Sequence, residues 1–152
     1  MAILVHGDAS FSGQGINYET IQMQNLESYE LGGIIHVVAN NQVGFTTSSK
    51  DARSTAFCTD LGKAYELPII HVNADDPIAV DYAFKVALEF RNKFKKDVIV
   101  DIVGYRKNGH NELDQPFFTQ PQMYDLISKH ENVLKIYEAK LISEGIEKVT
   151  KY

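Results

Sequence analysis

Short aliphatic runs alternate with amphipathic segments along the chain. The aliphatic runs cover residues 2–6, 34–39, 69–72 and 98–103, and each is followed by a Gly or an Asn. Runs of this kind predict strands that are buried on both faces of a parallel sheet. Helical patterns cover residues 16–27, 57–66, 77–95, 121–130 and 132–143. The alternation predicts an α/β fold with a doubly wound, mostly parallel sheet and helices on both of its faces.

The clearest helical pattern begins at residue 77. Asp76 can cap this helix and Pro77 suits its first position. Its apolar residues fall on one broad face, as in a helix that covers a sheet. By contrast, the polar and hydroxyl-rich segment 45–55 predicts a shaped loop.

Length and composition indicate one domain. The chain has 152 residues, of which 44% are hydrophobic and 23% charged, which is enough to bury a core. We expect residues 1–120 to form the α/β core and residues 121–152 to form a helical extension of the same domain. The chain enters its first strand with no lead-in, so we also expect it to be an excerpt of a longer protein.

Several classes of function are excluded by composition. The single cysteine, Cys58, rules out an internal disulfide framework and a cysteine-rich zinc site. A net charge of −5 with no basic tract argues against a nucleic-acid partner. The apolar runs are far shorter than the ~20 residues of a membrane span, and no secretory signal is visible.

Polar segments follow three of the predicted strands, at Gly7–Ser10, Asn40–Gly44 and Tyr105–Glu112. Ligands of doubly wound sheets bind beyond the carboxyl ends of the strands. Asp8, Asn41 and a nearby backbone carbonyl would offer the hard oxygen donors that Mg²⁺ prefers, and Mg²⁺ completes its shell with phosphate and water. A magnesium–diphosphate site is therefore predicted here, with His110 as a hydrogen-bond donor to the phosphates.

Each of these features alone has a simpler interpretation. Asp8 and Asn41 are also typical of helix caps and of turns that end strands, and His110 is typical of a solvent-exposed loop. His36, inside a strand, is favoured as a structural histidine, whereas His6 and His71 could line the crevice. Cys58 is favoured as a small buried side chain. Only the joint placement after strands indicates a site.

Five motifs in order resemble a known family. They cover Ile3–Gly15, Asn40–Thr47, Ala52–Ser54, His71–Pro77 and Gly109–Asp114. Together they closely resemble the thiamine-diphosphate-dependent first component of the 2-oxoglutarate dehydrogenase complex. Thiamine-dependent enzymes carry a Gly-Asp-Gly motif and, some thirty residues later, an asparagine. Here Asn41 follows Asp8 by 33 positions, and Ala9 replaces the second glycine.

The resemblance implies a thiamine-diphosphate-binding fold, of which this chain is the diphosphate-binding domain, and a set of site residues. Asp8 and Asn41 would bind Mg²⁺ through their side chains, and Val43 through its carbonyl. Ala9 and His110 would contact the diphosphate. The family's catalytic glutamate and most substrate histidines lie on other parts of the enzyme, so the resemblance implies that this segment alone is inactive.

For the whole enzyme, the resemblance implies decarboxylation of 2-oxoglutarate in the tricarboxylic acid cycle. The succinyl group would pass to a lipoyl-bearing succinyltransferase, and the enzyme would be a homodimer of the mitochondrial matrix or the bacterial cytoplasm. Gln115 replaces a glutamate that is common in the family, and part of the last motif also occurs in the related 2-oxoadipate enzyme. That enzyme, and a non-catalytic interaction module, remain the alternatives.

Overall fold

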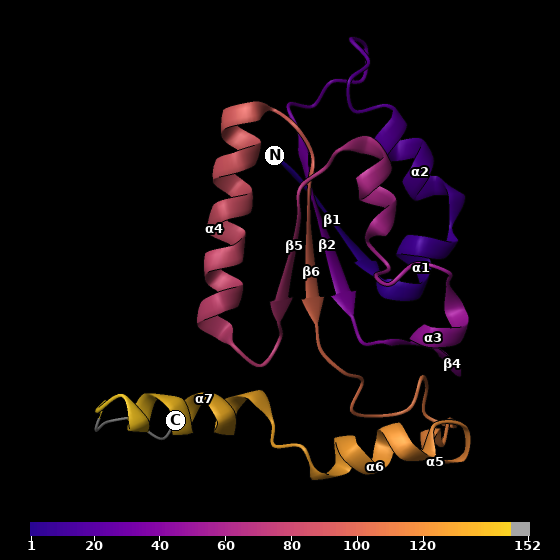
Figure 1. Ribbon diagram of the computed structural model, residues 1–152, viewed down its shortest axis with the longest axis vertical. Coiled ribbons are helices and arrows are strands. Elements are labelled where there is room, and N and C mark those ends of the chain that lie inside the picture. Colours follow the sequence, from indigo (N-terminus) through magenta and orange to yellow (C-terminus); the bar gives the residue numbers. More distant parts are fainter. Residues whose placement is uncertain (147–152) are drawn as a thin grey trace.

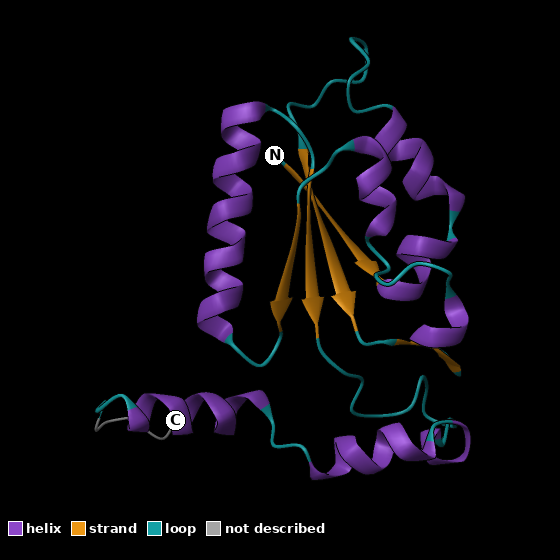
Figure 2. Cartoon of the chain, in the orientation of Figure 1, coloured by secondary structure: helices purple, strands orange, loops and turns teal. Residues whose placement is uncertain are grey.

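Four parallel strands form one sheet in the order β1-β2-β6-β5 (Figures 1 and 2). The computed structural model describes residues 1–146. The strands are β1 (Ala2–Gly7), β2 (Ile34–Asn40), β5 (Ile69–Asn73) and β6 (Val98–Val103). All four predicted strands are confirmed, and none differs from its predicted range by more than one residue.

Helices cover both faces of this sheet, as predicted (Figure 1). On one face lie α1 (Asp8–Gly13), α2 (Gly15–Gln22) and the 3₁₀ helix η1 (Asp60–Tyr65). Their apolar side chains form a core with the sheet that includes Phe11, Ile21, Val38, Leu61 and Ile99. On the other face lies α4 (Pro77–Phe94), which packs its small residues Ala83 and Ala87 against Ile35, Val37 and Val100. The doubly wound α/β prediction is therefore confirmed.

Helix α4 has the predicted boundaries within one residue. The side chain of Asp76 accepts a hydrogen bond from the backbone N of Ala79 at 3.1 Å, which satisfies one of the free amides at the start of the helix. The helix ends at Lys95, which has left-handed geometry and donates its backbone N–H to the carbonyl of Arg91.

Three predicted segments differ in the structure. The predicted helix 16–27 ends at Gln22, since the residues after it have little to pack against and Leu26 is exposed. The predicted helix 57–66 is the 3₁₀ helix η1. The predicted loop 45–55 contains strand β4 (Thr47–Ser48), which pairs with β3 (Val43–Gly44), and the short helix α3 (Ser49–Ala52). Helix α1 was not predicted, because so short a helix depends on burial of Phe11 in the core and not on a local pattern.

Three helices lie across the carboxyl ends of the strands (Figure 1). They are α5 (Pro116–Thr119), α6 (Pro121–Lys129) and α7 (Val133–Ser143), and the last two match predicted helices. Two polar contacts attach this layer to the turn before α4: an ion pair, with Lys140 Nζ 3.1 Å from Asp76 Oδ2, and a hydrogen bond, with His130 Nε2 2.7 Å from Asp75 Oδ2. Residues 147–152 of the predicted extension lie outside the described residues. Within residues 1–146, no helix has the length and apolarity needed to cross a membrane.

Candidate active site

The strand order reverses between β2 and β6, at the centre of the sheet. The connection from β1 to β2 runs over one face, and helix α4 joins β5 to β6 over the other. A cavity of about 340 Å³ opens at the carboxyl ends of these strands. Its lining residues are Ala39, Asn40, Asn41, Ala74, Ile102, Tyr105 and Arg106. Reversal points of this kind are where doubly wound sheets bind ligands.

Asp8 and the turn after β2 lie side by side at this end of the sheet. Strand β1 pairs with β2 as far as Gly7 opposite Ala39, so the residues after each strand emerge together. The contact is close: a Cβ atom added to Gly44 would lie only 2.8 Å from the Cβ of Ala9. The structure therefore brings together four of the predicted site residues, namely Asp8, Ala9, Asn41 and Val43.

The carboxylate of Asp8 is buried at the start of α1. The residue is only 3% exposed, and this burial raises the pKa of Asp8. Backbone amides, including those of Ala9 and Asn41, and the charge of Arg53 lower the pKa of Asp8 again but do not offset the burial. A buried carboxylate of this kind would be stabilised by a cation beside it.

The turn after β2 presents oxygen atoms. Asn41 Oδ1 accepts a hydrogen bond from the backbone N of Val43 at 3.2 Å, which fixes the direction of the amide group. Amide oxygens have two lone pairs, so one remains for a further partner. Between these residues, Gln42 has a φ of 66°, in the left-handed region that side chains disfavour.

His110 lies on the loop after β6, beside the same turn. Its ring is 4.8 Å from the ring of Phe45, centroid to centroid, and its backbone N donates to Asp114 Oδ2 at 2.8 Å. Arg106 Nη2 donates to the carbonyl of Phe45 at 3.0 Å and so attaches this loop to the turn. His110 thus joins the site through Phe45, and its imidazole is exposed to solvent.

The donor set fits a hard divalent cation that carries an anion. Asp8, Asn41 and the carbonyl of Val43 are all oxygen donors, as Mg²⁺ requires. Within residues 1–146, no three His, Cys, Asp or Glu side chains form a group that could hold a metal, so nitrogen- or sulfur-rich sites are not available there. Arg53 Nε and Nη1 are buried and have no acceptor among the described residues, which suits an anion nearby.

Comparison with known proteins identifies the family. The model of the family "Dehydrogenase E1 component" matches residues 1–152. The chain belongs to the dehydrogenase E1 component family. It is 53% identical over 146 residues to the "2-oxoglutarate dehydrogenase E1 component" of Bacillus velezensis. It is 57% identical over 145 residues to the "2-oxoglutarate dehydrogenase-like, mitochondrial" protein of Rattus norvegicus.

These matches cover most of the E1 chain described here but little of its relatives. The Bacillus velezensis match covers 96% of this chain and 16% of that protein. The Rattus norvegicus match covers 95% of this chain and 14% of that protein. The chain therefore spans about one sixth of the length of the curated relatives it matches.

Sequence reasoning missed the residues that support the site of this E1 chain. Asn40, Asp101 and Arg106 all contact the turn or its neighbours, but none was singled out for such a role. A charged residue inside the aliphatic run 98–103 was the available signal for Asp101. Arg53 is far from Asp8 in the sequence, and no local pattern predicts that its charge lies near that carboxylate.

The residues set aside as structural are buried in the E1 chain. His36 is fully buried, with its ring nitrogens 3.2 Å from His6 Nε2 and 3.3 Å from Asp97 Oδ2, which confirms the structural interpretation. Cys58 is also buried, and this raises the pKa of its thiol to about 12. Such a thiol is not a nucleophile at neutral pH.

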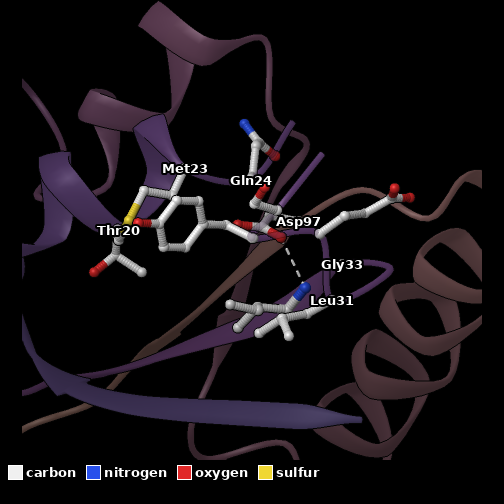
Figure 3. Close-up of a pocket in the computed structure, with 10 residues that line it drawn as sticks. Thr20, Met23, Gln24, Leu31, Gly33 and Asp97 are labelled. Carbon is white, nitrogen blue, oxygen red and sulfur yellow. Dashed lines mark hydrogen bonds between the residues drawn. The ribbon is translucent and has the colours of Figure 1, made fainter. Parts of the chain in front are cut away.

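A second cavity of the E1 chain lies at the opposite, amino end of the sheet (Figure 3). Its volume is about 280 Å³, and it lies between the end of α2, the segment 28–31 and Asp97. In Figure 3 the Asp97 carboxylate accepts a hydrogen bond from the backbone N of Ile34, at 2.8 Å. Since Asp8 and Asn41 follow the other ends of their strands, this cavity is separate from the candidate site.

Proposed function

We propose that this chain forms the part of a 2-oxoglutarate dehydrogenase E1 component that binds the diphosphate end of thiamine diphosphate through Mg²⁺. Asp8 and Asn41 would bind the metal through side-chain oxygens, and Val43 through its carbonyl. Ala9 and His110 would contact the diphosphate. The observation that carries the proposal is the contact of Ala9 with Gly44, since it holds Asp8 next to the Asn41–Val43 turn.

Charge in the site supports the same assignment. The buried Asp8 carboxylate would be neutralised by Mg²⁺, and the buried N–H groups of Arg53 would face the negative diphosphate. When bound, thiamine diphosphate supplies a nucleophilic carbon and an electron sink for decarboxylation of a 2-oxo acid. The residues of this chain would hold and orient that group.

The whole protein would then act with a partner. We propose that it decarboxylates 2-oxoglutarate and transfers the succinyl group to a lipoyl-bearing succinyltransferase, as a homodimer in the bacterial cytoplasm or the mitochondrial matrix. The names of the relatives support this assignment, since they are a bacterial 2-oxoglutarate dehydrogenase E1 component and a mitochondrial 2-oxoglutarate dehydrogenase.

Metal dependence tests the proposed cofactor site. We expect calorimetric titration of the intact protein with thiamine diphosphate to show saturable binding in the presence of Mg²⁺. Removal of Mg²⁺ with EDTA should abolish that binding, because the diphosphate would then meet the Asp8 carboxylate without the cation between them. Equal binding with and without Mg²⁺ would contradict the metal role, and no binding under either condition would contradict the cofactor assignment.

Substrate choice is tested separately. We expect the intact protein, loaded with cofactor, to show a kcat/KM for 2-oxoglutarate at least about tenfold above that for 2-oxoadipate. One extra methylene in a pocket is worth about 1–3 kcal/mol, or about 10–200-fold. A preference for 2-oxoadipate would reassign the substrate and leave the cofactor site unaffected.

A further inference from the structure

Asp101 is a buried carboxylate in the middle of the sheet, and the proposed cofactor site does not use it directly. The residue is 0% exposed and interrupts the aliphatic strand β6, which lies between β2 and β5. Its register partners are Val38 of β2 and His71 of β5. A carboxylate in this position has lost its hydration, so it is tolerated only where hydrogen bonds replace the water.

Both oxygens of Asp101 have partners on the neighbouring strands. Oδ1 accepts a hydrogen bond from Asn40 Nδ2 at 3.0 Å, and Oδ2 lies 2.8 Å from His71 Nδ1. Asn40 is the last residue of β2 and is itself 6% exposed. Asp101 therefore connects three strands, and through Asn40 it reaches the edge of the sheet where the candidate site lies.

Asn40 links Asp101 to the turn Asn41–Val43, which we call the metal-binding turn because it holds two of the proposed metal ligands. The amide nitrogen of Asn40 donates to Asp101, so the amide oxygen on the other side of the group faces away from Asp101. That oxygen accepts a hydrogen bond from the backbone N of Gln42 at 3.0 Å. Because Gln42 holds a left-handed φ of 66°, the turn depends on bonds of this kind to keep its shape.

The same turn carries two of the three proposed metal ligands. Asn41 precedes Gln42 and Val43 follows it, so the backbone of Gln42 sets where the Asn41 side chain and the Val43 carbonyl lie. Gln42 is also held by Gly104, whose carbonyl accepts from Gln42 Nε2 at 2.7 Å, and by Ser49, whose Oγ donates to the Gln42 carbonyl at 2.9 Å. These three contacts together fix the peptide units on either side of Gln42.

We propose that Asp101 is a positioning residue for the metal-binding turn, and that it acts through Asn40. The inference rests on the proposed function, since it concerns the turn that would hold Mg²⁺. Without the Asp101 carboxylate, Asn40 Nδ2 keeps, among the described residues, only its 3.6 Å contact with Cys58 Sγ, so the Asn40 amide is held less firmly and the turn adopts other conformations. Residues that orient metal ligands typically change affinity by about 10–100-fold, and we expect an effect of about tenfold.

The test measures cofactor affinity and folding stability of the intact protein in parallel. We expect Asp101→Ala to raise the Kd for thiamine diphosphate, in saturating Mg²⁺, by about tenfold. Asp101→Asn should stay within about threefold of the wild type, because its side-chain oxygen can still accept from Asn40 Nδ2. Asn40→Ala breaks the same link without removing the buried carboxylate, and should also raise the Kd by about tenfold.

A double substitution and a matched control separate positioning from general destabilisation. The double variant Asp101→Ala, Asn40→Ala should bind the cofactor no more weakly than either single variant, because both substitutions break the same hydrogen bond. Asp97 is the matched control: it is 1% exposed, accepts from the Ile34 amide and lies 3.3 Å from His36 Nε2, at the other end of the sheet. We expect Asp97→Ala to lower the free energy of unfolding and to leave the Kd unchanged.

The possible results are distinguishable. Failure of the wild type to bind Mg²⁺ and thiamine diphosphate contradicts the proposed function itself. A wild type that binds, together with Asp101→Ala and Asn40→Ala variants of unchanged Kd, overturns only the positioning role. If Asp101→Ala does not fold, the Kd values of Asn40→Ala and Asp101→Asn decide. A raised Kd for Asn40→Ala together with a Kd near the wild-type value for Asp101→Asn supports the positioning role. Any other pair of Kd values overturns it.

Discussion

Replacing Asp8 with asparagine is expected to weaken Mg²⁺-dependent binding of thiamine diphosphate by at least about 100-fold. Asp8 is the only charged group in the proposed ligand set, and asparagine keeps its shape but not its charge. Since loss of a residue that merely orients a ligand costs about 10–100-fold in affinity, loss of the ligand charge itself should cost more. Calorimetric titration of the intact variant protein in saturating Mg²⁺ would measure the effect.

The same substitution should make the cofactor-free protein more stable at neutral pH. Because burial raises the pKa of Asp8, the folded state holds this proton more tightly than the unfolded state does. The contribution of Asp8 to stability is therefore fully present below about pH 4 and is lost as the pH rises through the raised pKa. We expect Asp8→Asn to raise the apo melting temperature at pH 7, and to raise it by much less at pH 4.

An exposed carboxylate provides the control for both measurements. Asp81 lies on the outer face of α4, where its side chain is 63% exposed and pairs with Lys85. Asp81→Asn should change neither the cofactor affinity nor the apo melting temperature by a measurable amount. An Asp8→Asn variant that binds the cofactor as tightly as Asp81→Asn would remove Asp8 from the metal site.

Gly44→Ala is expected to reduce the affinity for thiamine diphosphate, in saturating Mg²⁺, by about 30-fold. The added Cβ would lie 2.8 Å from the Cβ of Ala9, which is closer than real Cβ atoms approach one another. Relief of this overlap must separate the start of α1 from the turn after β2, and it thereby moves Asp8 away from Asn41 and Val43. Displacing the ligands should act like the loss of a residue that orients them, which changes affinity by about 10–100-fold.

A compensating substitution tests whether the effect is steric. Removing the Cβ of Ala9 in the double variant Ala9→Gly, Gly44→Ala takes away the atom that the new methyl group would meet. The double variant should therefore recover most of the lost affinity. If the single and double variants bind the cofactor with equally low affinity, the effect of Gly44→Ala does not come from the overlap with Ala9.

The sheet was predictable from the sequence because its strands are locally distinct. Each of the runs 2–6, 34–39, 69–72 and 98–103 is aliphatic and is followed by a Gly or an Asn, so both its existence and its end are encoded within a few residues. Helix α4 was equally clear, since Asp76 and Pro77 mark its start. Helix α1 was not, because it depends on burial of Phe11 in the core, and for residues 57–66 the sequence predicted a helix but not the 3₁₀ geometry of η1.

The residues of the candidate site also form two groups, those that the sequence could predict and those that it could not. Asp8, Asn41 and His110 could be selected from sequence, because polar residues after buried strands of a parallel sheet gather at one edge. The roles of Asp101 and Arg53 could not, because each depends on contacts between segments that are far apart in the chain. Asp101, for example, meets Asn40 at a separation of 61 residues. No local pattern specifies such a pair.

The position of β6 in the sheet has a consequence for how the protein is made. Strand β6 is the last of the four to leave the ribosome, yet it lies between β2 and β5. Until it is synthesised, β2 and β5 both lack the strand that lies between them in the sheet of residues 1–146, so one edge of each stays open. Open edges of this kind bind other chains, so slow synthesis between residues 73 and 103 should favour aggregation of the nascent chain.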